Sequence, residues 1–329
     1  MSIRDGVRAG VVRAGLAAAL AASGPVRSAP SGCPVHVLTC AADVGRAIVA
    51  VKSLLSVAAC AERESVLSPH MWSDGSLTPR HERLIRRHLP DVHLVSSDVI
   101  EDALATLRRS APDLARIASS RRIYLKLAQV ALEPCCRAAK SVVMDSDYLW
   151  YARPDLLLSW IASSDDRILY NAELDRRRPG DPLRGGIYLP FVEHPDGSRT
   201  GMYAPEVVAA LGGMLGEHVG YARHFNAGLI AWPRHAMDLA FMERLAGAAT
   251  ELGFGPDAGG ASFLDQALLA FAAGRWPRHE PLPAEYYCYS RPRPDQLIAR
   301  HFIGPISSSP RSYLLPALRL TVNRPSRVA

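Results

Sequence analysis

Strand-like and helix-like segments alternate along the first 150 residues, and no other feature of the sequence constrains the fold as strongly. Apolar runs predict strands over 35–40, 65–72, 92–95 and 141–145. Amphipathic stretches predict helices over 43–59, 78–89, 98–109 and 121–139. Helices between successive strands favour parallel pairing. The pattern therefore predicts an α/β fold whose mixed, largely parallel sheet carries helices on both faces.

The second half of the chain is less regular, and no clear linker precedes it. A strand is predicted over 225–232 and helices over 236–252 and 261–273, whereas the proline-rich segment 275–300 is expected to be extended. A chain of 329 residues can form two domains of ~150 residues or one large α/β domain. The absence of a linker favours a single domain over 33–329, with its two halves meeting near residue 150.

Residues 1–32 differ in composition from the rest and form a lead rich in alanine and arginine, expected to be helical or disordered. Its longest apolar run, 14–22, is far shorter than the ~20 residues that a membrane span needs. Basic residues before that run make a signal peptide an alternative, but Asp5 and the weak hydrophobicity disfavour it. No CxxC pair occurs among the six cysteines, so reduced thiols and a cytoplasmic location are expected.

The net charge of +6 and the pI of about 9.1 come mainly from scattered arginines. A nucleic-acid-binding protein more often carries one basic stripe interleaved with aromatic residues, so no nucleic-acid partner is predicted. The arginine excess suits an anionic small ligand such as a diphosphate, or peripheral contact with an anionic membrane surface. The plain alternative is a solvated basic surface.

Asp145-Ser146-Asp147 is the only Asp-x-Asp in the chain and follows directly after a predicted strand. Ligands of open parallel sheets bind at the carboxyl ends of strands, and side chains two residues apart in extended chain point to the same side. Hard oxygen donors of this kind suit Mg²⁺ or Mn²⁺ bridging a diphosphate. The structural alternative is a pair of aspartates that ends a strand and caps a turn.

The surroundings of this motif resemble a known family. The segment 141–156, SVVMDSDYLWYARPDL, is similar to the strand, Asp-x-Asp and following segment of GT-A-fold glycosyltransferases, especially the glycogenin-like glycosyltransferase family 8. Four further segments resemble that family in the same order: the helix at 124–127, the Phe-Asn-Ala-Gly at 225–228, the Asp-Gln helix start at 263–268, and the His-Phe-Ile-Gly at 301–304. The resemblance covers about residues 34–305 and implies a nucleotide-binding half over 33–150 and an acceptor-side half over 151–329.

The resemblance implies a metal-dependent transferase that moves a sugar from a nucleotide-sugar donor, a UDP-sugar, to an acceptor hydroxyl. Asp145, Asp147 and His301 would hold Mn²⁺ or Mg²⁺, with the histidine favouring Mn²⁺. The metal would stabilise the leaving diphosphate. The acceptor would be a glycan, a lipid-linked glycan, a small molecule or a protein, and the loop at 180–205 is a candidate acceptor or lid element.

The remaining site residues follow from the same resemblance. Donor-binding roles fall on Thr39, Asp74, Lys126 and Gly304, and roles on the sugar and acceptor side fall on Asn226, Asp265 and Gln266. Each position has a structural alternative. His301 could be an ordinary structural histidine, Asn226 a turn residue, Asp265 an acidic residue in a first helical turn, and Lys126 a solvated helix residue.

One departure from the family and two competing functions stay open. The family's Lys-Pro-Trp is missing after residue 304, where the chain reads PISSSP, and Arg311 is the candidate substitute for the lysine. A haloacid-dehalogenase-like phosphatase would use Asp145 as its nucleophile, but it would place a hydroxyl residue where Leu149 stands. A non-catalytic binding protein on the GT-A fold is the second alternative. A nucleotidyltransferase is disfavoured, because the first strand is followed by no glycine-rich basic loop.

Overall fold

The computed structural model describes residues 3–59, 66–131, 138–172, 192–193, 199–200, 204–215, 222, 224–255, 264–288, 295–302 and 309–322. The α-helices are α1 (Ile3–Ala21), α2 (Val44–Ala58), α3 (Pro79–His88), α4 (Ser97–Ser110), α5 (Pro112–Ser120), α6 (Leu125–Ala131), α7 (Asp155–Ala162), α8 (Ala204–Leu215), α9 (Leu239–Glu251), α10 (Leu264–Arg275) and α11 (Leu315–Val322). Short helical turns form η1 (Arg122–Tyr124), η2 (Arg234–Ala236) and η5 (Pro310–Leu314).

The strands are β1 (Cys33–Thr39), β2 (Leu67–Ser73), β3 (His93–Val95), β4 (Lys140–Met144), β5 (Tyr148–Trp150), β6 (Ile168–Ala172), β7 (Val192–Glu193), β8 (Arg199–Thr200), β9 (Phe225–Pro233), β10 (His279–Pro281), β11 (Tyr286–Tyr287) and β12 (Ala299–His301). Seven of them form one sheet in the order β10-β6-β9-β4-β1-β2-β3. Every neighbouring pair is parallel except those of β9, which runs antiparallel to β4 and β6. The predicted mixed, largely parallel sheet is therefore confirmed.

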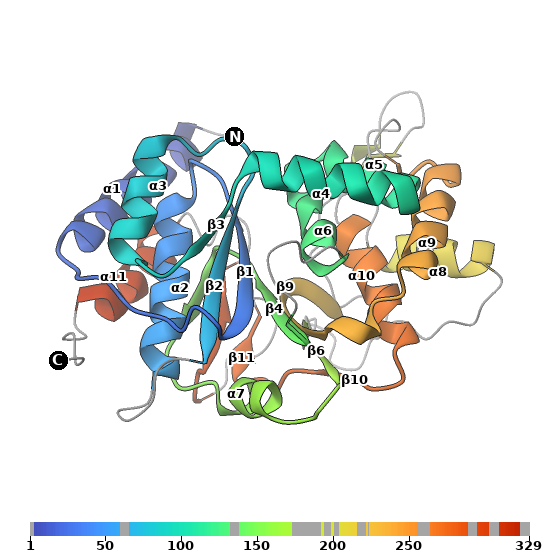
Figure 1. The fold of residues 1–329 in the computed structure, drawn as a ribbon. Helices are drawn as coiled ribbons and strands as arrows, with labels where there is room; N and C mark the ends of the chain where they lie inside the picture. Colours follow the sequence, from blue (N-terminus) through green and yellow to red (C-terminus); the bar gives the residue numbers. More distant parts are fainter. Residues whose placement is uncertain are drawn as a thin grey trace.

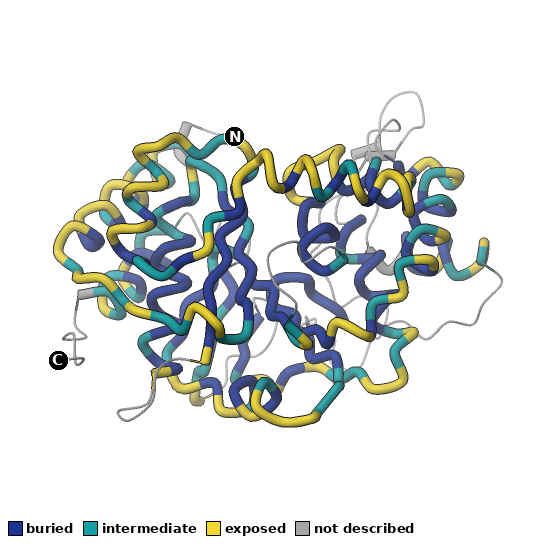
Figure 2. Tube along the Cα trace, viewed as in Figure 1, coloured by how far each residue is buried: buried dark blue, intermediate teal, exposed yellow. Residues whose placement is uncertain are grey.

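Helices cover both faces of the large sheet, with α1, α2, α3 and α11 at one end of the molecule and α4, α5, α9 and α10 at the other (Figure 1). Alternate strand residues point to opposite faces of the sheet, so each strand contributes side chains to two hydrophobic cores. On one face, Val37 and Met71 pack into a core with α1 and α2, whereas on the other Trp72 and Val143 pack with α4, α5 and α9. Strands β2, β6 and β9 of this sheet are buried along their length (Figure 2).

A second, smaller sheet of order β11-β12-β5 lies beside the carboxyl end of β4. β12 runs antiparallel to β5, and this pairing puts His301 opposite Tyr148. Strands of two or three residues are too short to show periodicity, which is why the sequence predicted only an extended segment here. This small sheet carries the C-terminal part of the chain back to the end of β4.

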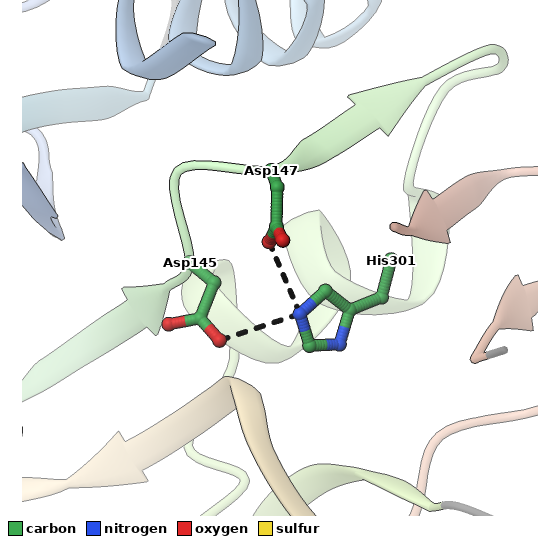
Figure 3. Close-up of side chains that lie close together, drawn as sticks. All are labelled: Asp145, Asp147 and His301. Carbon is green, nitrogen blue, oxygen red and sulfur yellow. Dashed lines mark ion pairs between the residues drawn. The ribbon is translucent and has the colours of Figure 1, made fainter. Parts of the chain in front are cut away.

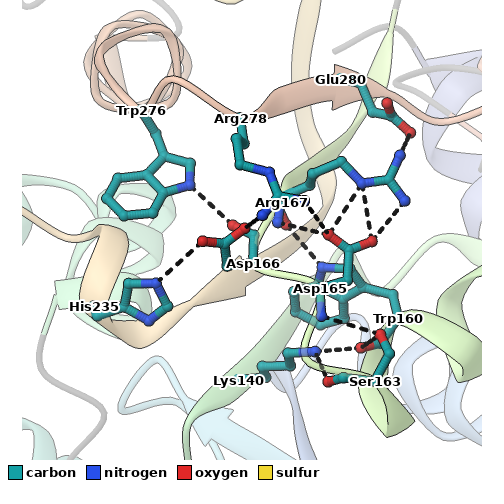
Figure 4. Close-up of polar contacts among 10 residues, drawn as sticks. All are labelled: Lys140, Trp160, Ser163, Asp165, Asp166, Arg167, His235, Trp276, Arg278 and Glu280. Atoms are coloured by element: carbon teal, nitrogen blue, oxygen red, sulfur yellow. Dashed lines mark hydrogen bonds and ion pairs between the residues drawn. The ribbon is translucent and has the colours of Figure 1, made fainter.

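An ion-pair and hydrogen-bond network ties down the sheet edge formed by β6 and β10 (Figure 4). Arg167 pairs with Asp165 at 2.6 Å and with Glu280 of β10 at 2.5 Å. At the start of β4, Lys140 Nζ donates to the carbonyl oxygens of Trp160 and Ser163, at the end of α7. The Lys140 contacts anchor the amino end of β4, whereas Asp145 follows its carboxyl end.

The predicted elements of the first half are present within a few residues of their expected bounds. The helix predicted over 121–139 begins as the turn η1 and continues as α6 to Ala131, beyond which 132–137 lie outside the described residues. Thr78 and Pro79 begin α3 as expected, with Thr78 at the N-cap. Most of the candidate loop at 180–205 also lies outside the described residues. Helices α5 and α7 were not predicted.

Candidate functional site

Asp145, Asp147 and His301 meet at the carboxyl end of β4 (Figure 3). Nε2 of His301 lies 3.3 Å from Oδ2 of Asp145 and 3.1 Å from Oδ1 of Asp147. The two aspartates lie in the connection between β4 and β5, and His301 ends β12. One potential ligand atom from each of the three residues lies within 4.8 Å of those from the other two.

Gly228 makes room for the imidazole of His301. It lies on β9, where its carbonyl oxygen accepts a hydrogen bond of 2.8 Å from the backbone N–H of Asp145. A Cβ atom at Gly228 would lie 2.2 Å from Cε1 and 2.5 Å from Nδ1 of His301. The close approach of β9 to His301 therefore requires glycine at this position.

Tyr148 stacks on His301, with ring centroids 4.6 Å apart and an angle of 16° between the planes. The buried Asn171 donates a hydrogen bond of 2.8 Å to the Tyr148 hydroxyl and another of 3.0 Å to the carbonyl oxygen of Tyr286. Sγ of the buried Cys288 lies 4.0 Å from Nδ1 of His301. None of these supporting residues was predicted, although a tyrosine directly after Asp147 was visible in the sequence.

Lys126 of α6 points into the same site and is buried. Its Nζ lies 2.6 Å from Oδ1 of Asp145 and donates a hydrogen bond of 3.3 Å to the carbonyl oxygen of Ala227. Both oxygens of Asp145 therefore face a nitrogen, Oδ1 that of Lys126 and Oδ2 that of His301. The alternative of a solvated helix residue is wrong for Lys126.

The charges in this site shift one another's pKa values. Burial alone would raise the pKa of Asp145, but Lys126 and His301 hold it below its ordinary value. Burial alone would lower the pKa of His301 and of Lys126, but the aspartates hold both above their ordinary values. The site is therefore a cluster of two partly exposed aspartates and two buried cations, in which charges of both signs stabilise one another.

Asp265, the second residue of α10, is also buried in this cluster. Burial raises the pKa of its carboxyl and nearby Asp145 adds to the rise, while Lys126 opposes it. Within the described part of the chain, Asp265 Oδ1 is buried and has no hydrogen-bond partner. A buried carboxylate oxygen left open in this way is unusual for a residue that only begins a helix.

Gln266 and Asn226 contact the β9 backbone beside the site. Oε1 of Gln266 accepts a long hydrogen bond of 3.4 Å from the N–H of Ala227, and Oδ1 of Asn226 accepts one of 2.9 Å from the N–H of Gly228. Both therefore help to fix the strand segment that passes His301 and Lys126.

Thr39 and Asp74 lie together at the carboxyl ends of β1 and β2, where the Asp74 N–H donates a hydrogen bond of 3.1 Å to the Thr39 carbonyl oxygen. The Asp74 carboxylate is held on one oxygen by Ser76 and on the other by Arg122 at 2.8 Å. Gly304, the last predicted site residue, lies outside the described residues. Arg311, the candidate substitute for the missing lysine, is exposed at the start of η5.

The three-residue cluster fits a divalent cation. Two carboxylates and one imidazole are the hard and borderline donors that Mn²⁺ and Mg²⁺ sites use, with Mn²⁺ better suited to the imidazole. Among the described residues, Asp147 Oδ1 is buried without a well-aligned hydrogen bond, as is expected of an oxygen that coordinates a cation. In the described part of the chain, this is also the one group of three potential metal ligands gathered closely enough.

No family model matches the sequence, and no curated protein matches it. Several solved structures do match in fold. Mouse xyloside xylosyltransferase 1 in its apo form is similar at 12% identity and a TM-score of 0.53, covering 82% of this chain and 97% of that one. A galactosyltransferase, LgtC, in complex with donor and acceptor sugar analogues is similar at 14% identity and a TM-score of 0.51, covering 89% and 98%.

The apo structure of the bifunctional glycosyltransferase WbbM is similar at 16% identity and a TM-score of 0.56, covering 90% of this chain and 50% of that one. At these identities the similarity establishes the architecture of the chain. The fold is that of GT-A glycosyltransferases, as the sequence predicted.

Proposed function

We propose that this protein is a metal-dependent glycosyltransferase that transfers a sugar from a UDP-sugar to an acceptor hydroxyl. The observation that carries the proposal is the cluster of Asp145, Asp147 and His301 at the carboxyl end of β4. In a largely parallel sheet that edge is where ligands bind. The structurally similar proteins described above, all glycosyltransferases, support the same class of reaction.

In this proposal, Asp145 and Asp147 hold Mn²⁺ or Mg²⁺ together with His301. The bound ion supplies Lewis-acid stabilisation to the leaving diphosphate. Tyr148, stacked on the imidazole, and Gly228, which makes space for it, keep His301 aimed at the aspartates. A metal site pre-positioned in this way needs little rearrangement when the donor binds.

Lys126 supplies a buried positive charge on the other side of Asp145. We assign it to the donor, where an ammonium held in a site of low dielectric attracts phosphate and sugar oxygens strongly. Thr39 and Asp74, at the ends of β1 and β2, are assigned to the nucleoside. Gly304 remains a proposed diphosphate contact on the family resemblance alone.

Asp265, Gln266 and Asn226 are assigned to the sugar and the acceptor side. The free oxygen of the buried Asp265 carboxylate is a candidate acceptor for a sugar hydroxyl. Gln266 and Asn226 hold the backbone of β9 next to Lys126 and Gly228. The acceptor itself is proposed to be a glycan, a lipid-linked glycan or a small molecule, because these share the hydroxyl that the reaction needs.

Calorimetric titration with UDP, in the presence and absence of Mn²⁺, tests the donor site. We expect binding that depends on Mn²⁺ and is lost in Asp145→Asn/Asp147→Asn. A matched control, Glu101→Gln/Asp102→Asn, removes two exposed carboxylates from α4 and should bind UDP as the unaltered protein does. Absence of UDP binding both with Mn²⁺ and in a parallel titration with Mg²⁺ would exclude the proposal.

A screen of UDP-sugars for metal-dependent release of UDP then separates the three functions. A glycosyltransferase releases UDP from one or a few of them, slowly to water and faster with a suitable acceptor. Metal-dependent UDP binding without any release would indicate the non-catalytic binding protein. The phosphatase alternative finds no support among the structurally similar proteins described above, and phosphate release from a phosphomonoester that depends on Asp145 would revive it.

A further inference from the structure

Helix α1 is apolar on its outer side as well as on its inner side. Val7 and Val11, one turn apart, are 63% and 48% exposed. The residues that continue the same face, Ala14, Ala17, Ala18 and Ala21, are exposed too. A surface helix of a soluble domain normally carries polar side chains there, and a helix that is apolar all round is normally covered. The outer face of α1 is therefore unusual.

The inner side holds α1 firmly on the protein. Val12, Leu16 and Leu20 are buried in the core shared with α2. Just after the C-terminal end of α1, Nζ of the buried Lys52 on α2 donates hydrogen bonds of 2.7 Å to Ser23 Oγ and 2.6 Å to the carbonyl oxygen of Gly24. The helix is thus part of the fold, and its outer face is presented in a fixed orientation.

Helix α11 lies against α1 and also exposes an aliphatic side chain. It packs against α1 at the same end of the molecule (Figure 1), and the close approach at Gly15 brings α1 against Leu314, just before α11. Leu315 is 50% exposed, and Arg311 and Arg319, one turn to either side of it, are exposed as well. Exposed aliphatic residues accompanied by arginine therefore occur on both helices.

The charge of this surface decides which partner fits it. Arg8 and Arg13 are exposed on opposite borders of the apolar face of α1. Asp5 is the only acidic residue of α1, and residues 309–322 contain none. A second copy docked symmetrically through this surface would bring like charges together, whereas an anionic surface would complement them.

Helix α3 adds to the positive charge at this end of the molecule. It packs on α2 and exposes Arg80, Arg83, Arg86 and Arg87 against a single exposed glutamate, Glu82. No helix in the described residues is long and apolar enough to cross a membrane. A fixed helix with an apolar outer face and flanking arginines instead suits the interface of a bilayer, where it lies parallel to the surface.

We propose that the outer faces of α1 and α11 form a docking surface for an anionic lipid bilayer. Val7, Val11 and Leu315 enter the boundary between headgroups and acyl chains, while Arg8, Arg13, Arg311 and Arg319 pair with lipid phosphates. None of these residues belongs to the metal-binding cluster, so this proposal is independent of the proposed function.

Cosedimentation of the full chain with vesicles tests it. We expect binding to vesicles of phosphatidylcholine with 30% phosphatidylglycerol (about one anionic lipid in three) at low salt, weaker binding at high salt, and little binding to pure phosphatidylcholine. Arg8→Gln/Arg13→Gln should weaken binding about thirty-fold, or about five-fold for each arginine. Val7→Ser/Val11→Ser should weaken it too, because less apolar area enters the bilayer.

Matched controls lie on α4, at the other end of the molecule. Arg108→Gln/Arg109→Gln removes the same charge from exposed positions, and Val99→Ser removes an exposed valine. Both should bind vesicles like the unaltered protein. Absence of binding to anionic vesicles at low salt, or equal loss in the α4 controls, would overturn the proposal. So would a dimer in sedimentation velocity that the Val7→Ser/Val11→Ser variant abolishes, because a second copy would then cover this face.

Discussion

At the scale of single residues, the site depends on the absence of a side chain at Gly228, because the imidazole of His301 needs that space. The ring of His301 occupies the volume that any side chain at Gly228 would fill, and Tyr148 closes the imidazole in by stacking. The position of His301 is thus fixed by two residues that lie outside the group of three potential metal ligands. Supporting residues of this kind commonly change metal affinity by about ten- to a hundred-fold.

Gly228→Ala tests this dependence. The added methyl group would displace the imidazole, so we expect Mn²⁺ affinity in calorimetric titration to fall about ten- to a hundred-fold. Gly213→Ala is the matched control, because a Cβ there meets nothing within 4 Å. It lies within α8 and should keep Mn²⁺ affinity unchanged. Equal affinity in both variants would show that His301 is not positioned by this contact.

Lys126→Met tests the balance of buried charge. Without its ammonium, Asp145 loses the partner on Oδ1 and faces Asp147 and Asp265. Because Asp145 is partly exposed, the loss should be smaller than the about 3–5 kcal/mol that breaking a fully buried ion pair costs. We expect a lower melting temperature in EDTA, and a larger rise on adding Mn²⁺ than in the unaltered protein.

Lys126→Arg keeps the charge and serves as the control for that experiment. Its melting temperature in EDTA should lie closer to that of the unaltered protein than Lys126→Met does. If Mn²⁺ stabilises Lys126→Met no more than the unaltered protein, the metal does not replace the charge of Lys126.

At the scale of elements, three histidines form a row across β1, β2 and β3. His36 pairs with His70 and His70 with His93 in the strand register, and the His70 and His93 rings stack at 4.5 Å. Burial, helped by His36 and His93, lowers the pKa of His70 to about 3. The folded protein therefore keeps His70 neutral, while the unfolded chain protonates it near its ordinary pKa of about 6.5.

This difference predicts acid sensitivity with a definite sign. The stability that the neutral His70 gives the folded protein is fully present above about pH 6.5. As the pH falls from there towards 3, the free energy of unfolding decreases by about 1.4 kcal/mol per pH unit. His70→Phe keeps an aromatic ring between its neighbours. Between pH 7.5 and 5.0 this variant should lose about 2 kcal/mol less unfolding free energy than the unaltered protein. Urea unfolding at the two pH values measures it.

A His70→Phe variant that loses as much stability on acidification as the unaltered protein would contradict the prediction.

Elements with strong periodicity were predictable from the sequence, and short ones were not. The run 142–144 is apolar throughout because β4 is covered on both faces, and this pattern placed Asp145 at a strand end correctly. By contrast, β11 and β12 have two and three residues, and their pairing with β5 is set by tertiary contacts. The link between His301 and Asp147 was therefore accessible only through resemblance.

The supporting residues of the site were missed for a similar reason. Asn171 lies on β6, distant in sequence from Tyr148, and nothing in either segment signals that they share a hydrogen bond. The burial of Lys126 was equally hidden, because a lysine on a short helix looks solvated until its carboxylate partners are known. Local pattern predicts elements, whereas contacts between elements decide which polar residues are buried together.

At the scale of the whole molecule, the cluster of Asp145, Asp147 and His301 joins distant parts of the chain. Asp145 and Asp147 flank the connection after the central β4, and His301 arrives from the C-terminal part on β12. The backbone strengthens this junction, since the N–H of Phe302 donates a hydrogen bond of 3.1 Å to the carbonyl oxygen of Asp147. A ligand bound to all three side chains would therefore tie the small sheet to the large one.

Hydrogen exchange with and without Mn²⁺ tests this coupling. Because a ligand that binds only the folded site stabilises whatever opening would disrupt it, Mn²⁺ should slow amide exchange in β5 and β12. Exchange in β3 and α4, which contribute nothing to the cluster, should change little. The Asp147→Asn variant should show a much smaller effect of Mn²⁺ at β5 and β12. Protection spread evenly over all these elements would mean that the ion stabilises the molecule globally, and an absence of protection at β12 would mean that His301 is not a ligand.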